Sequence, residues 1–326
     1  MIINEKYNLR NRNEEKGMKK YIWMITAVMM LALAACGNTE DTENEEASGG
    51  EPEMVPYTTD GGEEIEIPED PQRIVVLASS YFGNLMQLDA NVAGVSNDIE
   101  GSEVLKPMAE DGNVELLEVG NVEQVMNLDP DLIITFSTDE NLDKLKAIAP
   151  TIPVEYDKWN YLDVHEEMGR IVGKEEKAAE WVEGFEAELA EDKKAVEDAV
   201  GEDATATVME QYSKDIYVYG TNWGRGTEIL YQGLGLGVPE EIQNEVVETG
   251  WKSISAEEIE KYAGDFMFVG TGDGGADNAY KDTEVWQSLD AVKNDRVIEF
   301  DSPTFYYNDP YSLEHQKEFL VDALTK

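Results

Sequence analysis

The sequence predicts an α/β fold of two similar lobes joined by a single long α-helix. Continuous apolar runs over residues 73–78, 132–136 and 266–269 are typical of buried parallel strands. Segments with helical spacing of apolar residues alternate with these runs, which favours α/β units with parallel pairing. The same arrangement occurs in both halves of the chain, and a long amphipathic segment separates the halves. Two lobes and one connecting helix are the simplest interpretation.

The N-terminal half is predicted to become ordered near Tyr57. Gly61 and Gly62 lie between short alternating stretches, which predicts a β-hairpin. The predicted elements that follow, in chain order, are the second hairpin arm 64–67, a strand over 73–78, a helix over 81–88, a short strand over 92–95, a helix over 122–128 and a strand over 132–136.

The C-terminal half repeats this plan. A strand is predicted over 205–209, helices over 227–234 and 256–262, and a buried strand over 266–269. The two halves also share the pattern Glu-x7-Asp, in which the glutamate opens a predicted helix and the aspartate precedes an apolar strand. The pattern occurs once in each half, at Glu123 with Asp131 and at Glu257 with Asp265.

Residues 174–200 are predicted to form the connecting helix. Their apolar residues follow the three-four spacing of one buried stripe. At 1.5 Å per residue this helix is about 40 Å long, enough to bridge two lobes. A rigid brace of this kind limits hinge closure. The stripe consists of Ala178, Trp181, Val182, Phe185, Leu189, Val196 and Val200.

The N-terminal region is predicted to be a secretory signal. Residues 18–35 begin Met-Lys-Lys, continue with a short apolar run and end in Leu-Ala-Ala before Cys36 and a glycine. The run is too short to span a bilayer, which needs about 20 apolar residues. The Leu-Ala-Ala-Cys-Gly ending resembles a bacterial lipobox, in which the cysteine is lipidated and becomes the new N-terminus. A free or core cysteine after an ordinary signal peptide is the alternative.

The remaining boundaries follow from composition. Residues 1–17 are polar and precede the natural start at Met18, so we interpret them as an upstream extension from a mis-assigned start codon. Residues 38–53 are almost free of apolar residues, so we expect a flexible tether over 36–55. We expect an N-terminal lobe over 56–173, the connecting helix over 174–200 and a C-terminal lobe over 201–326.

The chain is strongly acidic, with 25 Lys and Arg, 70 Asp and Glu and a formal net charge of −45. Such a surface repels nucleic acid and anionic lipid head groups, so we expect no nucleic-acid partner and membrane contact only through the lipid anchor. One cysteine permits no disulfide framework. The sequence contains no Gly-x-Ser-x-Gly, no His-Glu-x-x-His and no catalytic thiol, which argues against an enzyme.

Two aromatic segments in the C-terminal half carry a family resemblance. Residues 217–226 read Tyr-Val-Tyr-Gly-Thr-Asn-Trp-Gly-Arg-Gly, and residues 306–310 read Tyr-Tyr-Asn-Asp-Pro. With the lipobox, the Ile-Pro-x-x-Pro-x-Arg-Ile-Val of residues 67–75, the Ser-Ser-Tyr-Phe-Gly of 79–83, the paired glutamates and the long helix, they make the chain similar to a known family. It resembles the substrate-binding lipoproteins of iron–siderophore ABC importers, above all the ferric-hydroxamate binders of Gram-positive bacteria.

The resemblance covers residues 18–326. It implies two Rossmann-like lobes joined by one helix, with the ligand in the cleft between them. The ligand is an iron(III)–siderophore complex in which the siderophore holds the iron, and no cofactor is implied. Residues 305–307 read Phe-Tyr-Tyr where close relatives have Tyr-Trp-Tyr, so the preferred siderophore is left open. The implied ligand-binding residues are Tyr217, Trp223, Arg225 and Tyr307 in the C-terminal lobe and Tyr81 and Tyr156 in the N-terminal lobe.

The family also implies a place and a partner. Glu123 and Glu257 match the glutamates that dock the family's proteins onto the ABC permease. We expect a monomer that is lipid-anchored on the extracytoplasmic face of the cell membrane. From sequence alone, the same glutamates are more typical of solvated first-turn residues that the helix dipole favours.

The chemistry of the cargo agrees with the resemblance. Three hydroxamates neutralise Fe³⁺ and leave oxygens facing outward, which suits one arginine with forked donors and several Tyr and Trp side chains. A catecholate complex is highly anionic and calls for clustered basic residues, which the sequence does not show. Other cargo in the same fold remains an alternative: a catecholate siderophore, haem or cobalamin. A free-metal binder would have to rely on His165 and His315.

Simpler interpretations stay open for individual residues. The segment 223–226 is also consistent with a turn into the helix predicted from Thr227, and Tyr217 and Tyr219 are consistent with ordinary strand aromatics. Arg225 is also consistent with a surface ion pair in so acidic a chain. Residues 270–277 are rich in Gly and Asp but lack the Asp-x-Asp-x-Asp-Gly order of a calcium loop, so a mobile loop is expected there.

Overall fold

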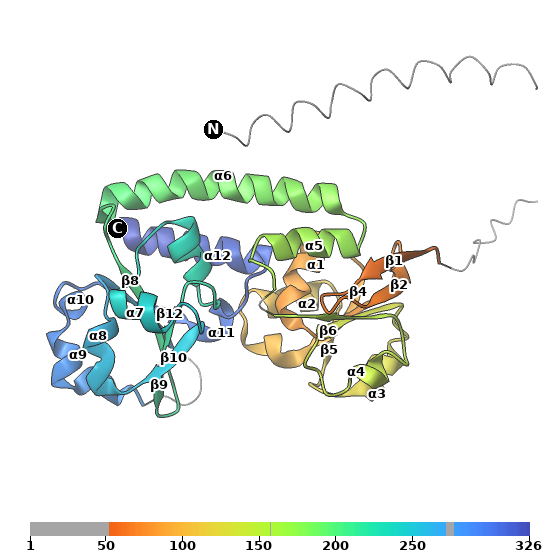
Figure 1. The fold of residues 1–326 in the computed structure, drawn as a ribbon, viewed down its shortest axis with the longest axis horizontal. Helices are drawn as coiled ribbons and strands as arrows, with labels where there is room; N and C mark the ends of the chain where they lie inside the picture. The colour runs from red at the N-terminus through yellow and green to blue at the C-terminus, as the bar shows by residue number, and fades with distance from the viewer. Residues whose placement is uncertain (1–51, 157, 272–276) are drawn as a thin grey trace, which may run out of the picture. The chain divides into compact units, whose positions relative to one another are not determined.

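The computed structural model describes residues 52–156, 158–271 and 277–326, and places in them two α/β lobes, each built around a five-stranded sheet (Figure 1). The N-terminal sheet is wholly parallel, in the order β5-β4-β3-β6-β7. The elements of this lobe are β1 (Met54–Thr58), β2 (Glu64–Pro68), β3 (Ile74–Val76), η1 (Ser79–Tyr81), α1 (Phe82–Gln87), β4 (Val92–Ser96), η2 (Asn97–Gly101), α2 (Leu105–Asp111), β5 (Glu115–Leu117), α3 (Val122–Asn127), β6 (Leu132–Phe136), α4 (Leu142–Leu145), β7 (Thr151–Val154) and α5 (Asp163–Ile171).

The central strand β3 is shorter than the predicted strand over 73–78. Its three residues are fully buried, as the apolar run indicates. The backbone N–H groups of Leu77 and Ala78 both donate to the carbonyl oxygen of Ile134, at 2.8 and 3.3 Å. This shared acceptor ends the regular ladder and turns the chain into η1, which carries Tyr81.

The predicted hairpin is present as the antiparallel pair β1 and β2, with Tyr57 opposite Ile65. β1 begins at Met54, inside the segment 36–55 that was expected to be a tether. Its backbone pairs with β2, and the ring of Tyr57 is buried in the core of the N-terminal lobe. Pairing and burial together explain why order begins earlier than the polar composition predicts.

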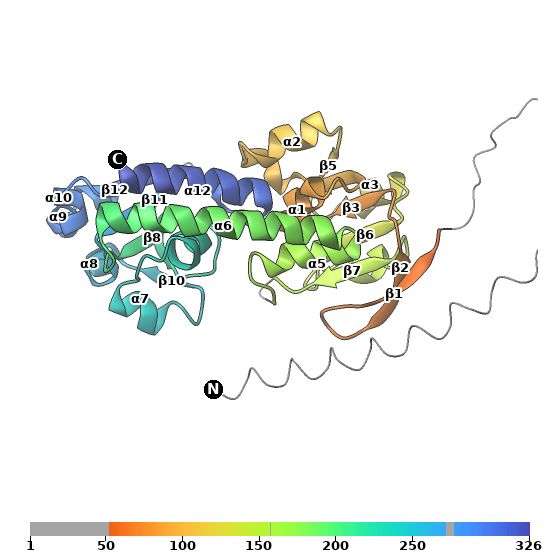
Figure 2. The same cartoon turned by 90° about the horizontal axis from the view of Figure 1, so that it is seen from above.

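The connecting helix is α6 (Glu175–Val200), close to the predicted span 174–200. Its buried stripe serves two cores, because Ala178 packs in the N-terminal lobe whereas Phe185, Leu189 and Val196 pack in the C-terminal lobe. α6 contacts α5 at one end and lies along α12 (Pro310–Thr325) over the rest of its length (Figure 2). The two lobes belong to one compact unit, residues 51–326.

The C-terminal sheet is mixed, in the order β10-β9-β8-β11-β12. β8, β11 and β12 pair in parallel, whereas β9 and β10 are antiparallel additions that the repeated α/β plan did not predict. The helix predicted over 227–234 is a π-helix. The elements of this lobe are β8 (Ala206–Tyr212), β9 (Asp215–Tyr219), η3 (Glu228–Gly233), α7 (Glu240–Glu245), β10 (Trp251–Ile254), η4 (Ala256–Glu258), α8 (Ile259–Tyr262), β11 (Phe266–Thr271), η5 (Ala279–Asp282), α9 (Glu284–Ser288), α10 (Asp290–Lys293), β12 (Val297–Asp301), α11 (Ser302–Phe305) and α12.

The repeated aspartate has the same structural role in both lobes. The Asp131 carboxylate accepts from the backbone N–H groups of Gln72 and Arg73, at 2.6 and 2.9 Å. The Asp265 carboxylate accepts from the N–H and the hydroxyl of Thr205, at 2.9 and 2.8 Å. Each aspartate therefore fixes the residue that precedes the central strand of its lobe, which gives the Glu-x7-Asp pattern a physical basis.

The lobes also meet directly, near the start of α12. The hydroxyl of Tyr307 donates to the carbonyl oxygen of Asp98 at 3.0 Å, and the N–H of Glu103 donates to the hydroxyl of Thr304 at 3.0 Å. A Cβ at Gly83 would lie 1.9 Å from an oxygen of Asp309, so only glycine allows α1 to approach this close. These contacts and α6 fix the spacing of the two lobes.

Candidate ligand-binding site

Three cavities share lining residues at the candidate site, with volumes of about 810, 390 and 50 Å³. We name them the main, outer and inner cavities. Residues of both lobes line the main and inner cavities, whereas the outer cavity is lined by the C-terminal lobe alone. The main and outer cavities fall within the range of small-molecule sites. The ring of Tyr306 lines all three, Trp223 lines the inner and outer cavities, and Arg225 lines the main and outer ones. All six ligand-binding residues predicted from the sequence line at least one of the three.

The Gly-Arg-Gly turn that presents Arg225 is sterically demanding. Arg225 has a φ of +60°, a left-handed conformation that non-glycine residues seldom adopt. Its N–H donates to the carbonyl oxygen of Phe305 at 2.6 Å, and a Cβ at Gly224 would lie 2.7 Å from the carbonyl oxygen of Tyr306. The segment 223–226 is thus a tight turn before η3, as the simpler interpretation holds, and it packs on the backbone of residues 305–306.

The guanidinium of Arg225 is clamped at the cavity wall. Its Nε donates to Glu210 Oε2 at 2.7 Å and its Nη1 to the carbonyl oxygen of Trp223 at 3.0 Å. The group lies between the rings of Tyr219 and Tyr306, 4.4 and 4.5 Å from their centroids. Only 18% of the side chain is exposed, so this is a partly buried pair rather than a surface one. Since a guanidinium has five N–H donors, the two bonds leave donors for a ligand.

Glu210 fixes the position of the Arg225 guanidinium through their ion pair. It is 5% exposed and accepts a second hydrogen bond from the Tyr219 hydroxyl at 2.6 Å. Burial raises the pKa of Tyr219, which keeps its hydroxyl protonated as a donor. Sequence reasoning missed Glu210, and it considered Tyr219 only as an ordinary strand aromatic, although its spacing of two from Tyr217 places both on one face of a strand.

Tyr306 and Tyr307 have different positions. Tyr307 lines the main cavity, but it is 6% exposed and its hydroxyl is engaged with Asp98 across the lobes. Tyr306, which the sequence did not single out, is the residue that stacks on Arg225 and borders every cavity. The aromatic wall at this point is therefore built mainly by Tyr306.

A series of aromatic rings lines the N-terminal side. Tyr81 lies 6.0 Å from Phe136, Phe136 lies 6.0 Å from Tyr156, and Tyr156 lies 6.0 Å from Trp223 in the other lobe. Tyr81 is buried, whereas Tyr156 is 45% exposed. The series leads from the core of the N-terminal lobe to the cleft, and its last contact crosses between the lobes.

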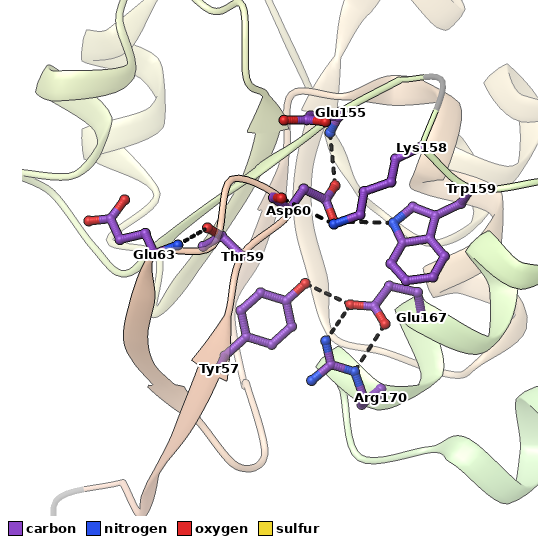
Figure 3. Close-up of polar contacts among 9 residues, drawn as sticks. All are labelled: Tyr57, Thr59, Asp60, Glu63, Glu155, Lys158, Trp159, Glu167 and Arg170. Carbon is purple, nitrogen blue, oxygen red and sulfur yellow. Dashed lines mark hydrogen bonds and ion pairs between the residues drawn. The ribbon is translucent and has the colours of Figure 1, made fainter.

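The loop that carries Tyr156 is held by Asp60 in the hairpin turn (Figure 3). The Asp60 carboxylate accepts from the N–H of Glu155 at 2.9 Å and from Nε1 of Trp159 at 3.2 Å, and pairs with Nζ of Lys158 at 3.0 Å. Its side chain is only 4% exposed. Asp60 is therefore a positioning residue for the cavity-lining segment around Tyr156.

A second polar cluster fixes the hairpin itself (Figure 3). The hydroxyl of Tyr57 on β1 donates to Glu167 Oε1 at 2.7 Å, and Arg170 binds the same carboxylate through two nitrogens at 2.6 and 3.0 Å. The guanidinium also lies 4.5 Å from the centre of the Tyr57 ring. These residues line none of the three cavities and join the hairpin to α5.

The comparison with known proteins identifies the family. Residues 74–304 match the family model described as periplasmic binding protein. The chain belongs to this family. It is 36% identical over 304 residues to the iron(3+)-hydroxamate-binding protein FhuD of Bacillus subtilis, which covers 92% of this chain and 95% of the relative. The family consists of binding proteins for transport, so this member is a binding component and not an enzyme.

Solved structures agree with the fold. The FhuD protein from S. pseudintermedius has 42% identity and a TM-score of 0.79, covering 84% of this chain and 98% of its own. FhuD2 from Staphylococcus aureus with bound ferrioxamine B has 40% identity and a TM-score of 0.75, covering 78% and 98%. The predicted fold of two α/β lobes with one connecting helix is confirmed, and so is the resemblance to iron–siderophore binding proteins.

The two predicted docking glutamates of this periplasmic binding protein lie outside the cavities. Glu123 is exposed in the first turn of α3 and Glu257 is exposed in η4. Their helix starts are capped by neighbours, since Asn121 accepts from the N–H of Gln124 at 3.2 Å and Ser255 forms a capping box with Glu258. Capping therefore does not require Glu123 or Glu257.

The histidines do not form a metal site. His165 is buried, its Nδ1 lies 3.0 Å from Asn84 Oδ1, and burial lowers its pKa to about 4. The ring packs edge-on against Trp181 at 5.0 Å, as a core residue would. Within residues 52–156, 158–271 and 277–326, no group of three or more His, Cys, Asp or Glu side chains is placed to hold a metal ion.

Some sequence predictions concern residues that the structure does not describe. Cys36, the signal segment and most of the expected tether precede residue 52, and most of the Gly-rich loop expected over 270–277 falls in the gap between 271 and 277. At its far end, Asp277 accepts from Gln211 at 3.0 Å. In the part of the chain that the structure describes, no helix combines the length and apolar character needed to cross a membrane.

Proposed function

We propose that this periplasmic binding protein captures ferric hydroxamate siderophores outside the cytoplasmic membrane and delivers them to the permease of an ABC importer for iron uptake. The observation that carries the proposal is the clamped guanidinium of Arg225 in an aromatic wall. The relatives support the cargo, since the Bacillus subtilis protein is named for iron(3+)-hydroxamate binding and the Staphylococcus aureus structure contains ferrioxamine B.

The charge of the cavity walls favours a hydroxamate over a catecholate. Arg225 is the only basic residue among the described residues that line the three cavities. The same walls contain four carboxylates, from Asp98, Glu155, Glu210 and Glu228. A wall with one cation and several anions repels a highly anionic complex but accepts a neutral one, to which arginine and tyrosine donate hydrogen bonds.

We assign ligand contact to the residues of the cavity walls. Arg225 donates to the oxygens that face outward from the iron centre, and the rings provide apolar faces with polar edges. Tyr306 joins the set because it borders all the cavities and stacks on Arg225. The proposed contacts are Tyr81, Tyr156, Tyr217, Trp223, Arg225, Tyr306 and Tyr307.

We also propose a lipid anchor at Cys36 and the ABC permease as the protein partner. Cys36 carries lipid and holds a monomeric protein on the extracytoplasmic face of the membrane, and Glu123 and Glu257 dock it onto the permease. The tether between Cys36 and the start of β1 at Met54 gives the lobes reach. Docking through carboxylates that line no cavity keeps ligand capture separate from delivery.

Tryptophan-quenching titration tests the cargo. We expect ferric tris-hydroxamates to quench emission saturably, since Trp223 lines two of the cavities, whereas ferric catecholate, ferric citrate and haem should not. Trp223→Phe should reduce the change, with the remainder from Trp159 and Trp251, which line the inner and outer cavities. Trp181→Phe is the matched control, because Trp181 stacks on Phe185 in the helix stripe and lines none of the three cavities. Saturable binding of only catecholate or haem would replace hydroxamate as the cargo.

A further inference from the structure

One face of the antiparallel part of the C-terminal sheet is directed at the outer cavity. Glu210 and Tyr212 lie two residues apart on β8, and Tyr217 and Tyr219 lie two apart on β9, so each pair shares a face. Strand register places Glu210 opposite Tyr217 and Tyr219 opposite Trp251. All five residues line the outer cavity.

The opposite face of the same strands is core. Met209 pairs with Val218 and Ile216 with Ile254, and all four are buried in one hydrophobic cluster. The alternation of buried aliphatic and cavity-lining aromatic residues fixes which way the rings point. Tyr212, Tyr217 and Trp251 form what we call the aromatic shelf.

The aromatic shelf is unusually open for its residue types. Tyr212 is 55% exposed and Trp251 is 45% exposed, and neither belongs to a hydrophobic core cluster. The Trp251 ring contacts the Tyr217 ring edge-on, with centroids 5.6 Å apart. Exposed aromatic rings that lie together on one face, unlike exposed residues scattered singly, mark interaction sites.

The aromatic shelf is continuous with the arginine site. Trp223 packs on the backbone just before Trp251, since a Cβ at Gly250 would lie 2.3 Å from the Trp223 ring. Trp223, Arg225 and Tyr306 line the outer cavity together with the shelf. A ligand whose iron centre is held at Arg225 therefore has the shelf beside it.

We propose that the aromatic shelf is a second subsite, which binds an alkyl arm ending in a protonated amine that projects from the iron centre of the siderophore. This rests on the proposed function. The faces of Tyr and Trp attract cations, and Asp215 lies opposite Tyr212 at the outer end of the shelf. Arg225, the only basic group among the described residues of this cavity, is paired with Glu210 at the inner end.

The test is a titration with four ferric tris-hydroxamates. Three share one linear chelating chain, which ends in a free amine, an acetylated amine or a succinylated amine. The fourth is ring-closed and has no arm. We expect the wild-type protein to bind the amine-ended ligand most tightly and the succinylated one most weakly, because the faces of aromatic rings attract an ammonium group and not a carboxylate.

Two shelf variants should lose this preference. We expect Trp251→Ala and Tyr212→Ala each to weaken binding of the amine-ended ligand about tenfold, which is roughly 1.4 kcal/mol, and to change binding of the ring-closed ligand less than twofold. Asp215→Asn should narrow the difference between the amine-ended and succinylated ligands. Tyr311→Ala is the control, an exposed aromatic that lines none of the three cavities, and thermal unfolding checks that each variant is folded.

The outcomes separate two conclusions. Equal losses on the armed and the ring-closed ligands would make Trp251 and Tyr212 general supports of the cleft and overturn the subsite. Unchanged binding of the amine-ended ligand in both folded variants would overturn it as well. A wild-type protein that binds none of the four would instead overturn the proposed function, and the subsite with it.

Discussion

The ring of Tyr156 in the N-terminal lobe lies 6.0 Å from the ring of Trp223 in the C-terminal lobe, at an interplanar angle of 71°. Both residues line the inner cavity, and each also lines one of the larger cavities. The edge-on contact places the two rings on opposite sides of the cleft. The position of Tyr156 depends on Asp60, and that of Trp223 on the turn at Gly224.

Asp60→Ala should weaken ferric hydroxamate binding severalfold. The substitution removes the acceptor for Glu155 and Trp159 and the carboxylate that pairs with Lys158, which keeps its bond to the backbone carbonyl oxygen of residue 60, so the segment around Tyr156 loses most of its anchor. A shift in the emission of Trp159 should accompany the loss. Glu63→Ala is the matched control, since Glu63 lies on the same hairpin and its side chain forms an ion pair with Lys146 at 2.7 Å, away from the segment around Tyr156. Full affinity in the Asp60 variant would show that Tyr156 is held without it.

Arg225→Ala should weaken ligand binding about tenfold to a hundredfold. Hydrogen bonds to a charged donor contribute roughly 1.5–3 kcal/mol, and each decade of affinity is about 1.4 kcal/mol. The variant also leaves Glu210 buried without its cation, which lowers the free energy of unfolding. A second variant with Arg225→Ala and Glu210→Gln should recover stability but not affinity. If the folded double variant regains affinity, Arg225 acts only as a structural partner of Glu210.

The cleft was only partly predictable from sequence because two kinds of contact build it. Tyr217, Trp223 and Arg225 stand in one contiguous motif and were found together. Glu210 and Trp251 reach the same cavity through strand register, which no local pattern reveals. This register is set by the antiparallel pairing of β9 with β8 and with β10. The repeated α/β plan predicts neither β9 nor β10.

The same distinction applies to the fold. Continuous apolar runs and the stripe of α6 depend on burial, which hydrophobic periodicity reports well. The lengths of β3 and β1 depend on individual backbone hydrogen bonds, such as those that Leu77 and Ala78 donate to Ile134. The different positions of Tyr306 and Tyr307 depend on the lobe contact at Asp98, which is tertiary.

Asp309 should give stability a dependence on pH. Burial raises its pKa to about 6, although its carboxylate caps α12 through the N–H groups of Tyr311 and Ser312. A carboxyl group whose pKa is raised in the folded protein binds its proton more tightly there than in the unfolded chain. Its contribution to the free energy of unfolding is therefore fully present below pH 4 and is lost as the pH rises through 6. Asp309→Asn should flatten the slope of unfolding free energy between pH 4 and 6, measured by denaturant unfolding. An unchanged slope would show that other titratable groups cause the pH dependence of stability.

Cys36→Ala should release the protein from the membrane. Lipidation at Cys36 is proposed from the Leu-Ala-Ala-Cys-Gly ending of a short apolar run, and two acyl chains anchor stably where one is marginal. We expect the variant in the medium or with its signal uncut, by fractionation and mass spectrometry. Cys36→Ser is a second variant with the same expectation. An unmodified Cys36 in the native membrane fraction would contradict the proposal.

Changing both Glu123 and Glu257 to Ala should leave siderophore affinity normal and impair uptake. Each carboxylate is exposed at the start of a helix in a different lobe, neither lines a cavity, and neighbouring residues provide the caps. Uptake should also fall with ionic strength, because contacts between exposed charges are screened. The measurements are tryptophan quenching in solution and iron uptake in cells.

The matched control changes Glu175 and Glu240, which are also exposed acidic residues in the first turns of helices, at the starts of α6 and α7. This pair removes the same charge from an acidic surface, so any loss of uptake that it shares with the Glu123 and Glu257 variant is a general charge effect. Docking requires that only the Glu123 and Glu257 pair impairs uptake. A fall in solution affinity would instead place these carboxylates in ligand capture, against the position that both have outside the cavities.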